Sequence, residues 1–406
     1  MNGFAWDMAG SGQRPPPIGD VRYNRWIPGV RRVDVSHERR VKSAALCRAG
    51  KLYDVERWIE SGKSIQTSPS TKKTALLAAV DTRFYSLVEL LARNEPRQEV
   101  KDRALAEAVE ARRLDMVHVL VEHGARVRSV PLADVLLTWD RALIQFFLDG
   151  GADPVTGNPF LIAFQNRVQR ALRPFVDYKK ARPEFADALQ VQTDRALRHF
   201  ANQADLKWIS LLMWAGANPR RLGPDLDDRY TDDPDCHTTA LREACSKGSL
   251  DALKKLKPDP RLDNLSDLLE AAALSDSKEL IDHLLHLGAQ PNDKPDGGSS
   301  ALDRCLWHLP WEDRNTFTSK QLASKYALQG GLARIERLLA AGAQWRPSDP
   351  DGTKSVRQML CKCEPAVTVT LMKLFAKYKA APEGLLEELL DTPRMRGHLS
   401  AIGMKL

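Results

Sequence analysis

Apolar residues recur along this chain with the spacing of an amphipathic helix, and the same pattern returns several times. In residues 117–125, Val-His-Val-Leu-Val-Glu-His-Gly-Ala, branched apolar side chains share one helical face until the run stops at a glycine. Glycine closes a helix well because it adopts a left-handed backbone without steric cost. Comparable runs end at Gly62, Gly151, Gly216, Gly288 and Gly342. This recurrence indicates a structural repeat.

A second phrase lies upstream of several of these runs and predicts a shorter helix. Thr74 is followed by Ala-Leu-Leu-Ala-Ala and Thr239 by Ala-Leu-Arg-Glu-Ala, while Asn158 and Ser300 open similar stretches. Side chains of these types cap a helix by accepting a hydrogen bond from a backbone N–H of its first turn. Each unit is therefore predicted to be a pair of helices, the first opened by a polar cap and the second closed by glycine.

The two phrases together resemble the ankyrin-repeat family, whose units begin with a Thr-Pro-Leu-His type of helix start and end in a Leu-Leu-x-x-Gly-Ala-Asp type of turn. The histidine of the helix start is absent from all four copies, and the 65 residues from Gly151 to Gly216 fit two units of the family period of about 33. The resemblance implies an all-α, ankyrin-like solenoid with insertions, made of about ten units over residues 42–381. It also implies a non-catalytic protein-binding scaffold or adaptor that uses a concave face.

The remaining segments depart from the repeat. Residues 1–41 are rich in arginine and proline, and we expect a disordered basic arm. Insertions are predicted near residues 164–190, which are basic, near 221–237, which are acidic, and near 306–330, which carry aromatic residues. Insertions in solenoids often project on the binding face. Residues 382–406 are predicted to form a capping helix and a tail.

Composition narrows the class of protein. The chain has 406 residues, 28% of them charged, with a net charge of +7. No stretch approaches the roughly 18 consecutive apolar residues of a membrane-spanning helix. Six cysteines are too few for a disulfide scaffold and favour a reducing, cytoplasmic location. The alternative location is that of a secreted effector without a cleavable signal, with the basic arm as the export or docking signal.

The sequence predicts neither an enzyme nor a cofactor. Phosphate-binding, dinucleotide-binding, His-Glu-x-x-His and Gly-x-Ser-x-Gly motifs are missing. Cys361 and Cys363 are too close together for the usual spacing of zinc ligands, and no second pair complements them. We therefore interpret the cysteines as packed thiols and expect no metal.

The expected partner is another protein, bound by a chain that is monomeric on its own. On the family pattern, the contact residues fall in turn tips and first helices, and two tryptophans of the late insertion join them as interface anchors. The predicted partner-binding residues are Lys72, Lys73, Arg242, Glu243, Asp303 and Arg304, which we expect to face outward, together with Trp307 and Trp311. A satellite core under the insertion is the alternative role for the two tryptophans. Alternative functions are an effector, an immunity or inhibitor protein and, with weaker support, a nucleic-acid-associated protein.

Overall fold

Paired helices run through the part of the chain that the computed structural model describes, which is residues 45–62, 74–224, 237–275, 277–295, 298–314, 321–345 and 365–380. The first helices of the pairs are α3 (Ala75–Thr82), α5 (Gln98–Glu110), α7 (Leu132–Leu137), α9 (Pro159–Gln165), α11 (Ala186–Asn202), α13 (Ala240–Ser246), α15 (Leu265–Ala272) and α17 (Ala301–Arg314). The second helices are α4 (Tyr85–Asn94), α6 (Leu114–Glu122), α8 (Arg141–Asp149), α10 (Leu172–Ala181), α12 (Leu206–Trp214), α14 (Leu250–Leu256), α16 (Lys278–Leu287) and α18 (Gln321–Ala340). Helices α2 (Leu52–Glu60) and α20 (Pro365–Tyr378) flank the pairs, and η1 (Val127–Ser129), η2 (Gln169–Ala171) and η3 (Pro183–Phe185) are short 3₁₀ turns.

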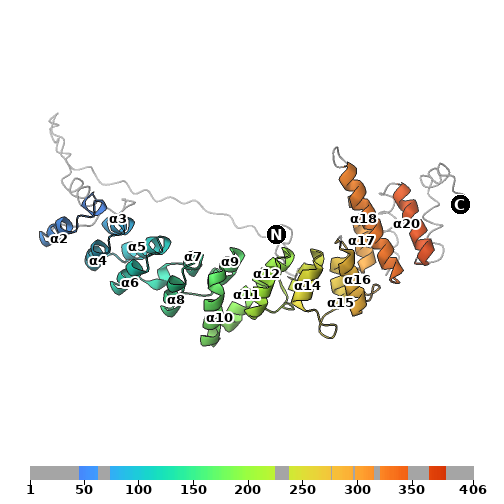
Figure 1. Ribbon diagram of the computed structural model, residues 1–406, viewed down its shortest axis with the longest axis horizontal. Helices are drawn as coiled ribbons and strands as arrows, with labels where there is room; N and C mark the ends of the chain where they lie inside the picture. The colour runs from blue at the N-terminus through green and yellow to red at the C-terminus, as the bar shows by residue number, and fades with distance from the viewer. Residues whose placement is uncertain are drawn as a thin grey trace, which may run out of the picture.

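The pairs stack side by side into an elongated molecule (Figure 1). Each first helix packs on the first helix of the next pair, from α3 through α17. Second helices form a parallel row in which α2, α4 and α6 pack in sequence, as do α12, α14 and α16. Because each pair contacts mainly its neighbours, the core is a continuous strip. The predicted all-α helical repeat solenoid is confirmed.

Polar caps open several helices as the sequence predicts. The Thr74 hydroxyl accepts a hydrogen bond from the backbone N–H of Leu77 at 3.3 Å, and the Thr239 hydroxyl accepts one from Arg242 at 3.2 Å. Asn158 differs, because its backbone is left-handed (φ 51°) and its side chain makes no cap bond. The helix that follows instead starts with Pro159, whose fixed φ suits the first turn.

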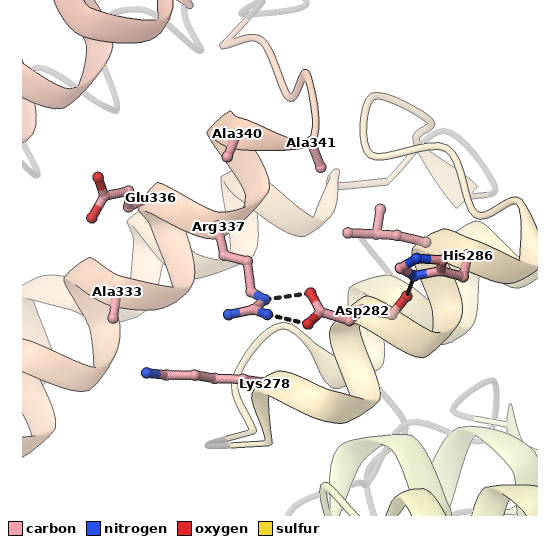
Figure 2. A pocket seen from close by; sticks show the side chains of 9 residues that line it. Lys278, Asp282, His286, Ala333, Glu336, Arg337, Ala340 and Ala341 are labelled. Atoms are coloured by element: carbon pink, nitrogen blue, oxygen red, sulfur yellow. Dashed lines mark hydrogen bonds and ion pairs between the residues drawn. The ribbon is translucent and has the colours of Figure 1, made fainter.

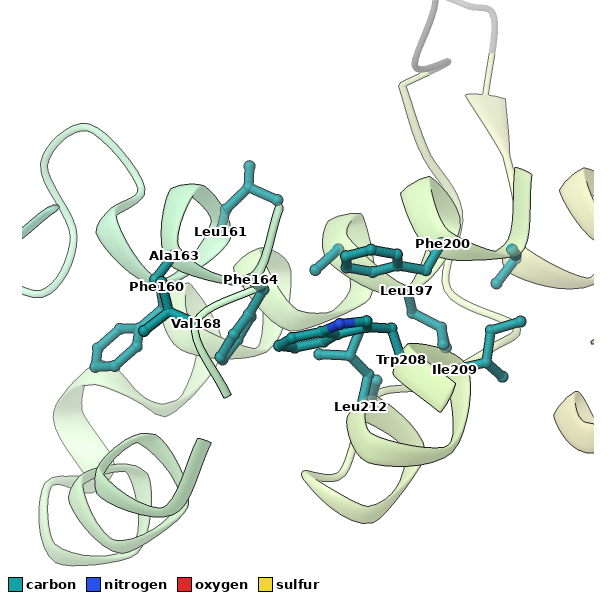
Figure 3. Close-up of a cluster of buried hydrophobic side chains, with 14 of the residues drawn as sticks. Phe160, Leu161, Ala163, Phe164, Val168, Leu197, Phe200, Trp208, Ile209 and Leu212 are labelled. Carbon is teal, nitrogen blue, oxygen red and sulfur yellow. The ribbon is translucent and has the colours of Figure 1, made fainter. Parts of the chain in front are cut away.

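Aromatic side chains from α9, α10, α11 and α12 gather in one part of the core, where Figure 3 shows Phe164, Phe200 and Trp208. Phe164 of α9 packs edge-to-face on Phe175 of α10 with ring centroids 5.4 Å apart. Phe200 of α11 stacks on Trp208 of α12 at 5.1 Å and 14° between planes. Since Phe175 is fully buried, the basic stretch predicted as an insertion near residues 164–190 supplies the second helix of the α9 pair.

The other predicted departures from the repeat are described only in part. Two short strands, β1 (Gly223–Pro224) and β2 (His237–Thr238), pair antiparallel at the base of the acidic segment, whose residues 225–236 lie outside the described chain. At the late insertion, α17 continues to Arg314 and α18 begins at Gln321, so both helices of this pair extend into the segment. The basic arm and the C-terminal segment 382–406 also lie outside the described residues.

A glutamine and an aspartate on α5 hold the turn that follows α6. The Gln98 side-chain amide donates to the Gly124 carbonyl and to the Asp102 carboxylate, both at 2.9 Å. Asp102 also accepts a hydrogen bond from the backbone N–H of Arg126 at 2.9 Å and pairs with its guanidinium. Desolvation raises the pKa of Asp102, but the hydrogen bonds from Arg126 and Gln98 outweigh it and hold that pKa below its ordinary value.

The same device recurs on α11, three pairs further along the stack. The Gln190 amide donates to the Gly216 carbonyl at 3.0 Å and to Asp194 at 2.7 Å, and Asp194 accepts the backbone N–H of Asn218 at 2.6 Å. Here the carboxylate is almost fully buried, and desolvation raises the pKa of Asp194 above its ordinary value. We call each Gln-x-x-x-Asp arrangement a turn clamp, because it fixes the glycine turn to the first helix of its own pair.

Candidate functional site

The predicted partner-binding residues Arg242 and Arg304 are brought together, but as members of an internal ion-pair ladder. Glu270 of α15 accepts from the Arg242 guanidinium on α13 at 2.7 Å and pairs with Arg304 on α17 through its other oxygen. Arg242 also pairs with Asp267. Burial lowers the pKa of Arg242, but the nearby carboxylates of Asp267 and Glu270 raise it by more. The pKa is therefore above its ordinary value, and the guanidinium stays charged. The ladder joins three consecutive first helices, and its charges are satisfied within the stack.

Glu243 and Asp303, predicted to face outward, are both engaged within the stack, each by a different neighbour. Glu243 is only 6% exposed and accepts a hydrogen bond from the Asn202 amide of α11 at 2.6 Å, so placing it outward was wrong. The Glu243 side chain on α13 faces α11, the preceding first helix. Asp303 is half-buried and accepts from the Ser300 backbone N–H at 3.1 Å and the Ser300 hydroxyl at 2.9 Å. Asp303 therefore stabilises the start of α17.

Three of the predicted residues cannot be placed, and one is exposed. Lys72 and Lys73 lie outside the described residues, as does the side chain of Trp311. Trp307 projects from α17 with 48% of its surface exposed, although Leu306 and Leu309 beside it are buried. Trp307 thus does not close a satellite core among the described residues, and its exposed ring suits a contact with another molecule.

A groove between α5 and α7 is the best candidate site on the first-helix row. Its volume is about 500 Å³. The apolar part of its lining comes from Ala106 and Val109 of α5, from Val130, and from Leu137 at the end of α7. Ala106 is exposed, and its small side chain leaves the groove open. Sequence reasoning missed the groove because none of these residues breaks the ordinary pattern of an amphipathic helix.

Charged side chains surround this apolar lining. They are Arg103, Glu107, Glu110, Arg112 and Asp134, all exposed. Among the described residues, Glu107, Glu110, Asp134 and Arg112 make no ion pair with one another or with a neighbour. The rim therefore offers three carboxylates and the Arg112 guanidinium group to a binding partner, around a small apolar floor.

A second cavity, of about 650 Å³, lies between α16 and α18 of the second-helix row (Figure 2). Arg337 reaches from α18 to pair with Asp282 of α16, and this hydrogen bond lowers the pKa of Asp282. Glu336 is engaged by Lys377 of α20 at 2.8 Å. Because these charges neutralise each other, the cavity presents less unpaired charge than the α5–α7 groove.

The described residues contain neither a cluster of metal ligands nor a membrane-spanning helix. Within the described ranges, no three His, Cys, Asp or Glu side chains group as metal ligands. Cys47, Cys245 and Cys305 are buried, the Cys305 thiol donates to the Ala273 carbonyl at 3.1 Å, and burial raises the pKa of Cys47 to about 11. None of the helices in this part of the chain is both long and apolar enough to cross a membrane. Cys361 and Cys363 lie outside the described residues.

Comparisons with known proteins give matches among solved structures. No family model matches this sequence, and no curated protein matches it. One similar solved structure is the ankyrin repeat domain of Bcl-3, a member of the IkappaB protein family, at 17% identity and a TM-score of 0.30, covering 64% of this chain and 92% of that one. Another is the human ASB11 ankyrin repeat domain, at 16% identity and a TM-score of 0.24, covering 72% of this chain and 96% of that one. Both are ankyrin repeat domains, the family that the sequence resembles.

Proposed function

We propose that this chain is a non-catalytic scaffold that binds another protein along its first-helix row, with the α5–α7 groove as the principal contact. The observation that carries the proposal is the groove itself, which combines an apolar floor with four charged side chains that make no ion pair among the described residues, Glu107, Glu110, Arg112 and Asp134. Protein interfaces have the same anatomy, a small apolar centre inside a polar rim.

The charge of the rim favours a protein over a nucleic acid. Glu107, Glu110 and Asp134 place three carboxylates around the groove, and these repel phosphates. A protein segment can instead insert one large apolar side chain into the floor and pair its flanking charges with the rim. A few such anchors supply most of the affinity of an interface.

Trp307 supports a second contact on the same row. Its exposed ring stands on α17, next to Arg304 of the ion-pair ladder. A partner long enough to reach from α5 to α17 would use both contacts. Arg242 and Arg304 would then act by holding the first helices in register, while Trp307 touches the partner.

The test compares one groove variant with a matched control. Ala106→Arg fills the groove with a residue that favours helix, and Ala142→Arg places the same side chain at an exposed alanine of α8. Native lysate is passed over wild type and both variants, and retained proteins are quantified by mass spectrometry. We expect a stoichiometric partner with wild type and Ala142→Arg that Ala106→Arg loses at least tenfold. Equal retention by all three proteins, or no partner with wild type, would overturn the proposal.

A further inference from the structure

The charge around the α5–α7 groove suits a basic ligand. Its rim carries three carboxylates against two guanidinium groups, and Glu107 and Glu110 lie on one exposed face of α5 because they are three residues apart. Asp134 approaches from α7. A ligand that complements the groove therefore has an apolar side chain for the floor and positive charges on either side of it.

One segment of this chain has that composition. Residues 21–33 read Val-Arg-Tyr-Asn-Arg-Trp-Ile-Pro-Gly-Val-Arg-Arg-Val, with four arginines and no acidic residue, although Asp20 and Asp34 flank them. Trp26 and Ile27 stand in the middle, between Arg25 and the pair Arg31 and Arg32. Pro28 and Gly29 oppose a helix and favour an extended or turned backbone. An extended segment can place Trp26 in the groove and arginines on both rims.

The segment can also reach the groove within its own chain. Trp26 precedes the first described residue, Ala45, by 19 residues (45 − 26), which span up to about 65 Å when extended. Helix α2 packs on α4, α4 packs on α6, and α6 packs on α5. Three helix spacings of about 10 Å put the groove roughly 30 Å from α2. The connecting residues are therefore about twice as long as the span requires.

We propose that residues 21–33 dock in cis into the α5–α7 groove, with Trp26 on its apolar floor and Arg25 and Arg31 against Glu107, Glu110 and Asp134. This inference goes beyond the proposed function, because it names a segment of the chain itself as an occupant of the groove. A protein partner that uses the groove must then displace the segment. The basic N-terminal arm acts as a competitive autoinhibitor whose strength falls as salt rises.

Photo-crosslinking in the full-length chain tests the contact. A benzophenone amino acid replaces Arg103 at the rim, because a bulky side chain at Ala106 would itself fill the groove, and in a second protein it replaces Asp134 on the opposite wall. The control carries it at Ala142 of α8. After irradiation, monomer-sized products are digested and mapped by mass spectrometry. We expect both groove positions to label residues 21–33 and the control to label them at least fivefold less.

Charge reversal separates specific docking from chance proximity. Glu107→Lys with Glu110→Lys should lower the crosslinking yield from position 103 at least fivefold, and adding Arg25→Glu and Arg31→Glu should restore it. Labelling of another segment, equal labelling from Ala142, products of dimer size or a yield unchanged by charge reversal would each overturn docking in cis. The lysate experiment tests the proposed function by comparing wild type with Ala106→Arg, and it does not depend on residues 21–33. Failure of the crosslinking experiment therefore overturns docking in cis without overturning the proposed function.

Discussion

The turn clamp on α5 yields a quantitative prediction about stability. Substitution of Asp102 by alanine removes the acceptor for the Arg126 backbone N–H, for its guanidinium and for the Gln98 amide. Substitution by asparagine keeps one oxygen for the backbone N–H but removes the charge. The two variants therefore divide the clamp into its hydrogen-bonding and its ionic parts.

The expected sizes follow from burial. The Asp102 side chain is 10% exposed, whereas the Arg126 side chain is 65% exposed and can be rehydrated when its partner is lost. An ion pair with one exposed partner contributes about 1 kcal/mol at most, and each further hydrogen bond about 0.5–1.5 kcal/mol. We expect Asp102→Ala to lower the free energy of unfolding by about 2 kcal/mol and Asp102→Asn by about 1 kcal/mol.

The pH dependence of this effect has a definite sign. Because the pKa of Asp102 is depressed in the folded protein, its charged form is favoured by folding, and the stabilisation is fully present above the unfolded value of 3.8. It is lost as the pH falls below 3.8 through the depressed folded value. The difference in unfolding free energy between wild type and Asp102→Asn should therefore shrink from pH 7 toward pH 3.

Equilibrium urea unfolding, followed by circular dichroism at both pH values, measures this difference. The control is Asp177→Asn, which breaks the exposed Arg173–Asp177 pair within α10 and touches no turn. It should change the free energy of unfolding by less than about 0.5 kcal/mol. If Asp102→Asn behaved like this control at pH 7, or if its effect grew toward pH 3, the turn clamp would not stabilise the fold as described.

Four further outcomes are expected. Phe164→Ala, at a fully buried ring, should lower the free energy of unfolding by about 3–5 kcal/mol in the same urea assay. Glu270→Gln should lower it by about 2–3 kcal/mol, since Arg242 and Arg304 lose their shared carboxylate, and an Arg304→Met background should reduce that loss. Trp307→Ala should change it by less than about 0.5 kcal/mol because the ring is exposed, and a large loss would place Trp307 in a core. The Cys47 thiol, with its pKa raised to about 11, should resist alkylation at pH 8 in the folded protein and react in urea, as read by mass spectrometry.

The helix pairs could be predicted from the sequence because the residues that start and end each helix act locally. A cap such as Thr74 and a turn glycine such as Gly288, which has a φ of 108°, act within a few residues of themselves. The basic stretch near residues 164–190 is predicted as an insertion because of its charges, and α10 within it buries Leu172 and Phe175. A helix of the solenoid can thus look like an insertion when the sequence is judged by net charge.

The orientation of first-helix residues could not be predicted in the same way. A first helix is covered by two neighbouring first helices and by its own second helix, so a polar residue such as Glu243 can be buried against α11 while Arg242 beside it pairs with α15. Their partners lie 41 and 28 residues away. Without the register between units, local periodicity does not separate a side chain that faces a neighbour from one that faces solvent.

The groove arises because neighbouring first helices differ in length. Helix α7 has six residues and α5 has thirteen, so α7 leaves part of the α5 surface uncovered, and Ala106 adds little bulk there. Regular units of equal length would close this space with each other's side chains. In a solenoid whose units differ in length, a step from a long helix to a short one can therefore leave room for a partner without any loss of core packing. The α5–α7 step meets that condition, and its unpaired carboxylates decide which charge the occupant must carry.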